Sequence, residues 1–217
     1  MRVLVTAGGT REPVDDVRVL TNLSTGRLGA HLADIFVAAG HDVRLLHGHG
    51  AVQPRADLVR QVFGSAAELS ALLDEHAPGC DVVLHAAAVS DFVPDRSAGK
   101  ISSAQDELVL VLRRAPKLID RLRALAPEAV LVGFKLTSGR THDERVQISR
   151  QLLTRAHLDL VVSNDVALVD EHDHEVLLID AGASAGTSMG HGGGKSAVAA
   201  AIFEAVEALV TKDAARP

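Results

Sequence analysis

Two pairs of glycines near the start of the chain enclose most of the residues that could do chemistry. Gly8 and Gly9 end an apolar run, and Gly26 and Gly29 open an apolar-periodic segment. Glycines at a strand-to-helix junction let backbone N–H groups approach a phosphate, and the helix dipole adds a positive field. The intervening loop carries Arg11, Glu12, Asp15, Asp16, Arg18 and Asn22. A loop this long and polar is typical of a binding or reacting segment, and it predicts a nucleotide-type site.

A dinucleotide-dependent dehydrogenase is one alternative for this loop. The dinucleotide fingerprint packs its glycines close together, whereas the two pairs here lie far apart. An NAD site also places Asp or Glu at the end of the second strand, where this chain has Leu45, Leu46 and His47. The chain has no tyrosine, which a short-chain reductase would need. These features disfavour an NAD(P)-dependent reductase, but they leave it open beside a non-catalytic nucleotide-binding domain.

A second glycine-rich segment, 182–194, precedes Lys195 and Ser196 and invites a phosphate-loop interpretation. The motif G-x-x-x-x-G-K-[ST] would put its first glycine on Met189, and no strand is expected directly before it. We therefore predict a glycine-rich linker over 181–194 and place Lys195 early in a final helix.

Metal-ligating and cationic side chains need separate treatment. His172, Asp173, His174 and Glu175 fall on an expected hairpin turn, where adjacent side chains rarely converge on one ion. We therefore predict no metal site built from protein side chains. Lys100 lies in a polar segment, 93–103, that we expect to be a mobile loop. It is either a solvated side chain or a cation that closes over a phosphate, and the residues alone leave both open.

Strands and helices alternate along the whole chain and must position these groups. Strands are expected at 2–6, 42–46, 58–63, 81–85, 107–113, 129–134 and 158–163, with a hairpin at 166–169 and 175–180. Helices are expected at 25–39, 66–76, 116–125, 141–156 and 195–211, with a capping box at Ser65 and Glu68 and Pro116 as a first helical residue. This alternation predicts an α/β fold: a doubly wound, mostly parallel, Rossmann-like sheet with a late β-hairpin, in a single domain over 1–217.

The carboxyl ends of the strands are where such sheets bind ligands. Four polar clusters are expected there: Gly8-Gly9, 86–91, Phe134-Lys135 and Asn164-Asp165. Their convergence is a stronger indication of a site than any one motif.

Composition limits the class of protein. The chain has 217 residues, 47% of them hydrophobic and 23% charged, which suits one globular domain. The net charge is −6 and the basic residues are scattered, so no nucleic-acid partner is expected. Cys80 is the sole cysteine, which excludes an intramolecular disulfide and suggests a reducing compartment. With no signal peptide and no long apolar run, we expect a cytoplasmic protein with no membrane partner.

Six motifs together resemble phosphopantothenate–cysteine ligase, a family of coenzyme A biosynthesis. They are the glycine loop, the run 86–92, the segment 100–103, the segment 115–119, the segment 133–136 and the segment 163–165. They occur in the family's order between residue 3 and about 180. The chain begins at its first strand, so it resembles the stand-alone form, which lacks the flavin-bearing decarboxylase half.

The resemblance implies a two-step reaction. A nucleoside triphosphate with Mg²⁺ activates the carboxylate of 4′-phosphopantothenate as an acyl-nucleotidyl intermediate and releases pyrophosphate. The amine of L-cysteine then attacks the acyl carbon, giving 4′-phosphopantothenoylcysteine and a nucleoside monophosphate. Both steps pass through oxyanions, so they call for placed N–H donors and cations.

The resemblance also implies roles for individual residues. Asn22 would contact the acyl intermediate, Arg18 would lie near the substrate, and Lys100 would be the flap lysine of nucleotidyl transfer. The phosphate-binding loop would comprise Gly8, Gly9, Ser24, Gly26 and Gly29. The other nucleotide contacts would be Ala86, Ala87, Ala88, Asp91, Pro116, Lys117, Leu118, Ile119, Phe134 and Arg155. Asn164 would close the substrate site, to which Lys135 would also contribute.

Departures from the family pattern affect the nucleotide and its phosphates. Ser102 and Ser103 follow Lys100 where many fused bacterial relatives, which use CTP, carry further lysines. This resembles the stand-alone and eukaryotic pattern, and eukaryotic enzymes take ATP. We favour CTP but keep ATP open. Late-helix lysines that touch phosphates in fused forms align with Gln151 and Arg155, or with Arg150 if the register slips. The family forms homodimers, and the hairpin after Asn164-Asp165 is a candidate docking element. A separate decarboxylase chain would be a further partner.

Overall fold

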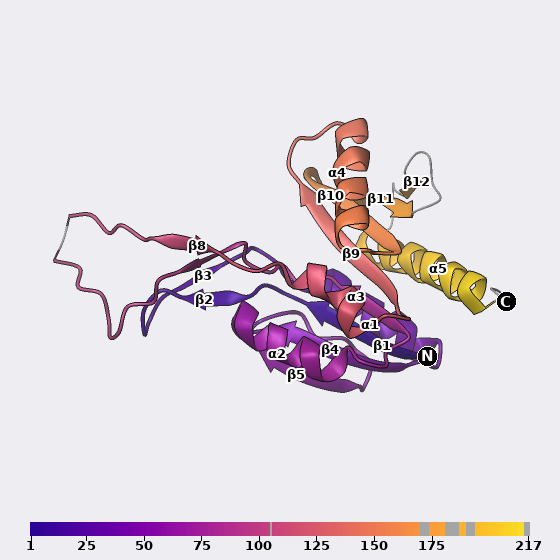
Figure 1. Ribbon diagram of the computed structural model, residues 1–217, viewed down its shortest axis with the longest axis horizontal. Helices are drawn as coiled ribbons and strands as arrows, with labels where there is room; N and C mark the ends of the chain where they lie inside the picture. Colours follow the sequence, from indigo (N-terminus) through magenta and orange to yellow (C-terminus); the bar gives the residue numbers. More distant parts are fainter. Residues whose placement is uncertain (105, 170–173, 181–186, 190–193, 215–217) are drawn as a thin grey trace.

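The computed structural model describes residues 1–104, 106–169, 174–180, 187–189 and 194–214 (Figure 1). An eight-stranded sheet forms its centre. The order across the sheet is β12 (Thr187–Met189), β11 (His174–Asp180), β10 (Leu160–Val169), β9 (Val130–Thr137), β6 (Val82–His85), β1 (Arg2–Ala7), β4 (Asp42–Gly48) and β5 (Val59–Phe63). Neighbours from β10 to β5 are parallel, whereas β11 is antiparallel to β10 and β12. The predicted doubly wound, mostly parallel sheet with a late hairpin is confirmed.

Helices cover both faces of this sheet. Helices α1 (Arg27–Ala38) and α5 (Gly194–Ala214) pack on one face, and α2 (Ala66–His76), α3 (Leu122–Leu125) and α4 (His142–Arg155) cover the other. Side chains alternate along β1, so Val3 and Val5 join the first core and Leu4 joins the second. None of the helices in the described ranges is long and apolar enough to cross a bilayer.

Two short hairpins lie outside the central sheet. Strands β2 (Arg11–Pro13) and β3 (Val19–Thr21) form one, and β7 (Phe92–Pro94) and β8 (Leu112–Arg114) form the other. We call the residues between β7 and β8, 95–104 and 106–111, the arm. In Figure 1 the arm extends away from the central sheet, with β2 and β3 near its base.

The structure corrects two predicted elements in this region. The strand predicted at 107–113 is wrong for most of its length, because only Leu112–Arg114 is a strand and it pairs in the outer hairpin. The apolar side chains of 108–111 are exposed, so their pattern belongs to the arm and not to a core strand. The helix predicted from Pro116 begins later, as a 3₁₀ turn, η1 (Leu118–Arg121), followed by α3. The extended backbone of Lys117 separates Pro116 from this turn.

Smaller differences concern the hairpin, the linker and a cap. The strands predicted at 158–163 and 166–169 are one strand, β10, whose pairing with β11 is irregular between Asn164 and Val169. The hairpin turn, with His172 and Asp173, lies outside the described residues.

The predicted linker contains β12, so the expectation of no strand before Gly190 was wrong; residues 181–186 and 190–193 lie outside the described residues. Lys195 is confirmed as an early residue of α5. The capping box at Ser65 is half formed: Ser65 Oγ accepts from the Glu68 N–H at 3.2 Å, but the Glu68 carboxylate accepts from the Gly64 N–H.

Candidate functional site

The two glycine pairs meet at the carboxyl end of β1. Gly8 and Gly26 have φ of +83° and +70°, a left-handed backbone that favours glycine. A Cβ on Gly26 would lie 3.2 Å from the Gly8 nitrogen, and one on Gly29 would lie 2.5 Å from the Ala7 Cβ. The loop and the start of α1 therefore approach each other more closely than larger residues would allow. The Arg27 N–H at the start of α1 donates to Thr25 Oγ1 at 3.4 Å, whereas Gly26, which precedes the helix, has no side chain to cap the N–H groups that follow.

The run predicted to contact the nucleotide lies directly against this glycine loop. The Ala88 N–H donates to the Gly8 carbonyl at 2.8 Å, and the Thr10 N–H donates to the Ala88 carbonyl at 3.2 Å. The Asn22 side-chain amide also donates to the Ala88 carbonyl, at 3.2 Å. Gly9 and Ala88 thus extend the parallel pairing of β1 and β6 beyond the strands themselves. The structure brings Gly8, Gly9, Asn22 and Ala88 together, as predicted for one site.

Two buried polar residues beneath this junction had no predicted role. Thr6 Oγ1 accepts from the Ala87 N–H at 3.1 Å and lies 3.0 Å from His85 Nδ1. Burial lowers the pKa of His85 to about 4, so its imidazole is neutral near pH 7. Both residues interrupt otherwise apolar strand ends, and that was the available sequence signal. Together they fix the backbone of the Ala86–Ala88 run from below.

The two cationic candidates are held close to each other. The Arg18 guanidinium donates from Nη1 to Asp15 Oδ2 at 2.6 Å and to the Ile101 carbonyl at 3.4 Å. Ile101 directly follows Lys100, whose side chain is exposed on the arm. The structure therefore brings Arg18 next to the part of the arm that carries Lys100, although they are distant in sequence.

The remaining nucleotide candidates divide between the two faces of the sheet. Asp91 and Lys117 form an ion pair, and Arg155 donates from Nε to Asp120 Oδ1 at 3.1 Å. Leu118 and Ile119 pack in the core beneath α2, α3 and α4, whereas Phe134 packs against the core beneath α1 and α5.

Pro116 is exposed and Ser24 is half-buried. Leu118 and Ile119 pack on one face of the sheet and Phe134 packs on the other. Residues 116–119 and Phe134 could therefore contact the same ligand only if it extended across the carboxyl edge of the sheet.

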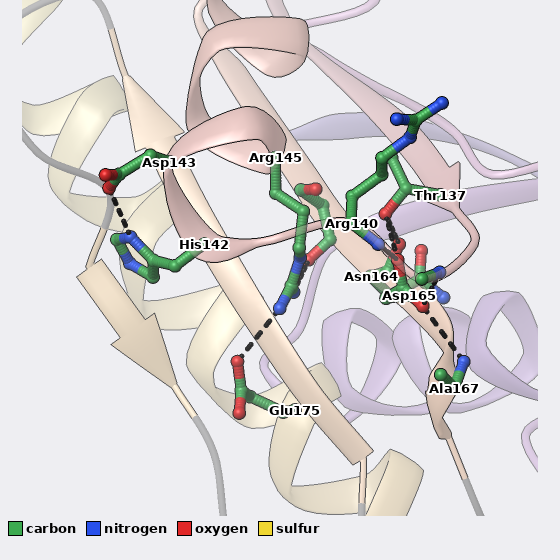
Figure 2. Close-up of polar contacts among 11 residues, drawn as sticks. Thr137, Arg140, His142, Asp143, Arg145, Asn164, Asp165, Ala167 and Glu175 are labelled. Carbon is green, nitrogen blue, oxygen red and sulfur yellow. Dashed lines mark hydrogen bonds and ion pairs between the residues drawn. The ribbon is translucent and has the colours of Figure 1, made fainter.

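Asp165 ties the end of β10 to the loop between β9 and α4 (Figure 2). Its Oδ1 accepts from the N–H groups of Gly139 and Ala167, each at 2.9 Å. Its Oδ2 accepts from Thr137 Oγ1 at 2.7 Å and from the Arg140 N–H at 3.1 Å. The hydrogen bond from Thr137 is the largest influence on the pKa of Asp165; with the backbone donors it outweighs burial and holds that pKa far below its usual range. Asp165 is therefore an ionised anchor.

Asn164 and Lys135 do not share a face of the sheet. Lys135 pairs in register with Ser163, and Asn164 pairs with Leu136, so alternation turns their side chains to opposite sides. The buried Arg145 donates to the Ser163 carbonyl at 3.1 Å and to Glu175 Oε1 at 3.0 Å (Figure 2). Asn164 thus sits between two anchored neighbours, and the proposed substrate role of Lys135 requires a ligand that spans the strand end.

Two further features bear on ligand binding. An open cleft of about 750 Å³ runs along α4 and is lined by His142, Asp143, Val146, Gln147, Arg150, Gln151, Thr154 and Arg155. Partial burial lowers the pKa of Lys195, and the nearby charge of Arg27 lowers it further. The starts of α1 and α5 therefore carry neighbouring cations, which sequence reasoning missed because Arg27 and Lys195 lie far apart in the sequence. The described residues contain no cluster of three or more His, Cys, Asp or Glu side chains that could hold a metal ion.

Known proteins are similar to this chain in sequence and in fold. Residues 1–209 match the model of the family described as "DNA/pantothenate metabolism flavoprotein C-terminal domain". A coenzyme A biosynthesis bifunctional protein CoaBC from Thermococcus kodakarensis is 39% identical over 180 residues, which cover 82% of this chain and 44% of that protein. Its counterpart from Mycobacterium bovis is 36% identical over 220 residues, covering 94% of this chain and 51% of that protein. The chain thus spans about half the length of these relatives.

Solved structures agree with the sequence matches. The DNA/pantothenate metabolism flavoprotein from Streptococcus pneumoniae superposes with a TM-score of 0.87 at 28% identity, covering 96% of this chain and 99% of that one. The C-terminal domain of a CoaBC protein gives 0.79 at 25% identity, covering 97% and 96%. A Cab2 mutant in complex with phosphopantothenate-cysteine gives 0.83 at 23% identity, covering 99% and 87%, and it bears on the fold alone. The chain therefore belongs to the family of the DNA/pantothenate metabolism flavoprotein C-terminal domain.

Proposed function

We propose that this chain joins 4′-phosphopantothenate to L-cysteine through an acyl-nucleotidyl intermediate. One observation carries the proposal: the glycine junction, the Ala86–Ala88 run and Asn22 meet at the carboxyl end of one parallel sheet, and the β2–β3 hairpin that follows the junction carries Arg18 beside the arm residue Ile101. The CoaBC relatives are named for coenzyme A biosynthesis, which supports the same chemistry. The site offers N–H donors and cations for oxyanions, as both steps need.

The first step is nucleotidyl transfer. The substrate carboxylate attacks the α-phosphorus of the nucleotide, and pyrophosphate leaves with the electron pair of the broken P–O bond. Lys100, exposed on the arm, would offset the charge that develops on the phosphate oxygens. Arg18 would orient the anionic substrate, while N–H groups in the first turn of α1 would bind a phosphate.

The second step is attack of the cysteine amine on the acyl carbon. A tetrahedral oxyanion forms, and it collapses when the nucleoside monophosphate leaves. One N–H of the Asn22 amide is held by the Ala88 carbonyl at 3.2 Å. Since an amide carries two N–H donors, the other remains to donate to the oxyanion. The Ala88 contact would therefore aim the catalytic donor.

The co-substrate is the finer part of the proposal. We favour CTP over ATP from the resemblance to bacterial forms, and flavin has no part in the chemistry. The described side chains offer no cage for a cation, so Mg²⁺ would arrive on the triphosphate and supply charge neutralisation there. Arg150 and Arg155, which both line the α4 cleft, are the cations of that helix that we propose for phosphate contact.

A homodimer is the assembly that we infer. The arm and the first residue of β8 expose a row of apolar side chains: Leu108, Val109, Leu110, Val111 and Leu112. Exposed contiguous apolar surface favours association, and a second copy would cover both arms at once. This surface supports docking through the arm better than through the late hairpin. A separate decarboxylase chain remains a proposed further partner.

Pyrophosphate release tests the proposed function directly. The purified protein is assayed with Mg²⁺ and 4′-phosphopantothenate, with CTP or ATP, and with or without cysteine. We expect release that depends on 4′-phosphopantothenate, with one nucleotide clearly preferred. A folded sample that releases none with either nucleotide would contradict the proposal, and NAD(H) titration would then test the reductase alternative.

A further inference from the structure

Asp15 is a buried carboxylate that spans two distant segments. It lies in the turn between β2 and β3, and its side chain has no exposed surface. Its Oδ1 accepts from the N–H groups of Val17 and Arg18, each at 2.8 Å, which is the local turn that Asp or Asn commonly makes. Its Oδ2 accepts from Arg18 Nη1 at 2.6 Å and from the Ile101 N–H at 3.1 Å. One oxygen therefore forms the turn, and the other joins the turn to the arm.

Further contacts hold the base of the arm against this turn. The Ser97 N–H donates to the Val14 carbonyl at 2.9 Å, and the Asp16 N–H donates to the Gly99 carbonyl at 3.3 Å. Gly99 has φ +71° with open space around it, so glycine is favoured there by the backbone and not by crowding. The bonds to Gly99 and Ile101 therefore hold the residues on both sides of Lys100.

The charge balance keeps Asp15 ionised. Burial alone would raise the pKa of Asp15, but the N–H groups of Val17, Ile101 and Arg18 and the charge of Arg18 together lower it. The Arg18 side chain is about 39% exposed. Its Nε and Nη2 atoms donate to no described residue. Asp15 thus restrains Arg18 through one nitrogen and leaves two for an anion.

We propose that Asp15 is a positioning residue for the first step, whose Oδ2 sets Arg18 and the base of the Lys100 arm in one fixed arrangement. This inference rests on the proposed function. It adds that the two cations do not act independently, since one carboxylate orients both. A loss of Asp15 Oδ2 would release the arm and Arg18 together.

The variant Asp15→Asn removes this link while preserving the turn. The amide oxygen can still accept from Val17 and Arg18, but its NH₂ would face the donors of Arg18 and Ile101. Asp16→Asn is the matched control, because Asp16 is adjacent and exposed. Its side chain also reaches the arm, through Arg96 at 3.0 Å, but an exposed ion pair contributes little and an amide oxygen can still accept from Arg96. Both variants remove one negative charge from the same turn.

Hydrogen exchange tests the docking without reference to activity. We expect the Ile101 amide and the peptide over 95–101 to exchange about tenfold faster in Asp15→Asn. In Asp16→Asn, which loses only the charge of an exposed pair with Arg96, exchange should change by less than about twofold. Unchanged exchange in Asp15→Asn would overturn the inference, whatever the enzyme does. This outcome differs from failure of the proposed function, which the wild-type pyrophosphate assay reports.

Single-turnover kinetics test the positioning itself. We expect Asp15→Asn to slow pyrophosphate formation about 100-fold with unchanged nucleotide affinity, and Asp16→Asn to stay within about twofold of the wild type. In a Lys100→Arg background, which keeps the charge but moves it, Asp15→Asn should add less than about a tenfold loss. A full second loss there, or equal losses of nucleotide affinity and rate, would assign Asp15 a merely structural role.

Discussion

Buried polar residues hold the backbone near the exposed polar residues that we propose for the site. Asn22 and Lys100 are exposed, whereas Thr6, His85 and Asp15 lie beneath them and hold backbone or side-chain groups in place. Buried polar groups are costly unless they are hydrogen-bonded, so a buried group with several partners fixes its neighbours firmly. The side chains proposed for the reaction can then project into solvent while their backbones stay fixed.

Asn22 and Lys100 should fail at different steps when replaced. Asn22→Ala removes the donor for the second oxyanion, so it should accumulate the acyl-nucleotide. Lys100→Ala removes the cation of the first step, so it should form no intermediate and release no pyrophosphate. Quenched reactions separated by chromatography would distinguish the two. Lys212→Ala, an exposed lysine in the last turn of α5, is the control and should behave as wild type. Normal turnover by both site variants would make the assignment wrong.

His85 should make stability depend on pH. Its pKa is about 4 in the folded protein and 6.5 in its unperturbed state, so the unfolded chain binds more protons between these values. The free energy of unfolding should therefore fall as pH decreases from 6.5 to 4, by on the order of 3 kcal/mol from this group.

Urea unfolding of the wild type and His85→Gln across this range measures the contribution as a difference of slopes. Because burial also lowers the pKa of His76, the wild type alone would not isolate it. Parallel pH profiles for the two proteins would contradict the prediction.

Strand ends at the carboxyl edge are extended by specific contacts. The Gly9–Ala88 bridge prolongs β1 and β6, and Asp165 closes β10 onto the loop that follows β9. At the start of α4, Thr141 and Glu144 form a full capping box, so this helix begins at a defined residue. These contacts turn four strand ends into one continuous edge.

Asp165→Asn should weaken this edge. Four donors face the two carboxylate oxygens, so an amide NH₂ would oppose either Gly139 and Ala167 or Thr137 and Arg140. The midpoint temperature of unfolding of Asp165→Asn should fall well below that of Asp143→Asn, which changes an exposed residue of α4 and is the control.

The pH dependence of this loss has a definite sign. Since the folded pKa of Asp165 is depressed, its stabilisation is present above the ordinary value of 3.8 and is lost as pH falls below it. The difference between wild type and Asp165→Asn should therefore shrink below that pH in thermal scans. A constant difference would show that the carboxylate's charge is not what stabilises the edge.

The molecule combines a central sheet, with a hydrophobic core on each face, and an exposed arm. Both faces of the central sheet are covered by helices, and the arm extends away from it (Figure 1). The apolar side chains at 108–111 of the arm are exposed. Such surface is unfavourable in an isolated monomer, and a partner would remove it from water.

The arm and the late hairpin can be compared as dimer contacts. Val109 on the arm is 81% exposed, and Val166 on β10 is 55% exposed. We expect Val109→Lys to shift the protein toward monomer in sedimentation velocity runs, because a buried charge opposes association. Val166→Lys should leave the assembly intact. The reverse result would assign the interface to the hairpin, and monomers of the wild type would remove the dimer itself.

The sequence by itself determined the layers of this protein and the end of the sheet where chemistry belongs. Both depend on local backbone and burial preferences, which a sequence carries. The informative features were the apolar runs at 2–6 and 81–85 and the glycines Gly8, Gly9 and Gly26.

Tertiary structure decided the rest, because it depends on contacts between distant segments. The apolar pattern at 108–111 is the same for a core strand and for an exposed arm, and only chain packing distinguishes them. Likewise, the sequence places Asp15 in a long polar loop. Its Oδ2 atom acquires a role only when Ile101 is folded against it. The pairing of Asp91 with Lys117 and the separation of Asn164 from Lys135 follow from register and faces, which no local preference specifies.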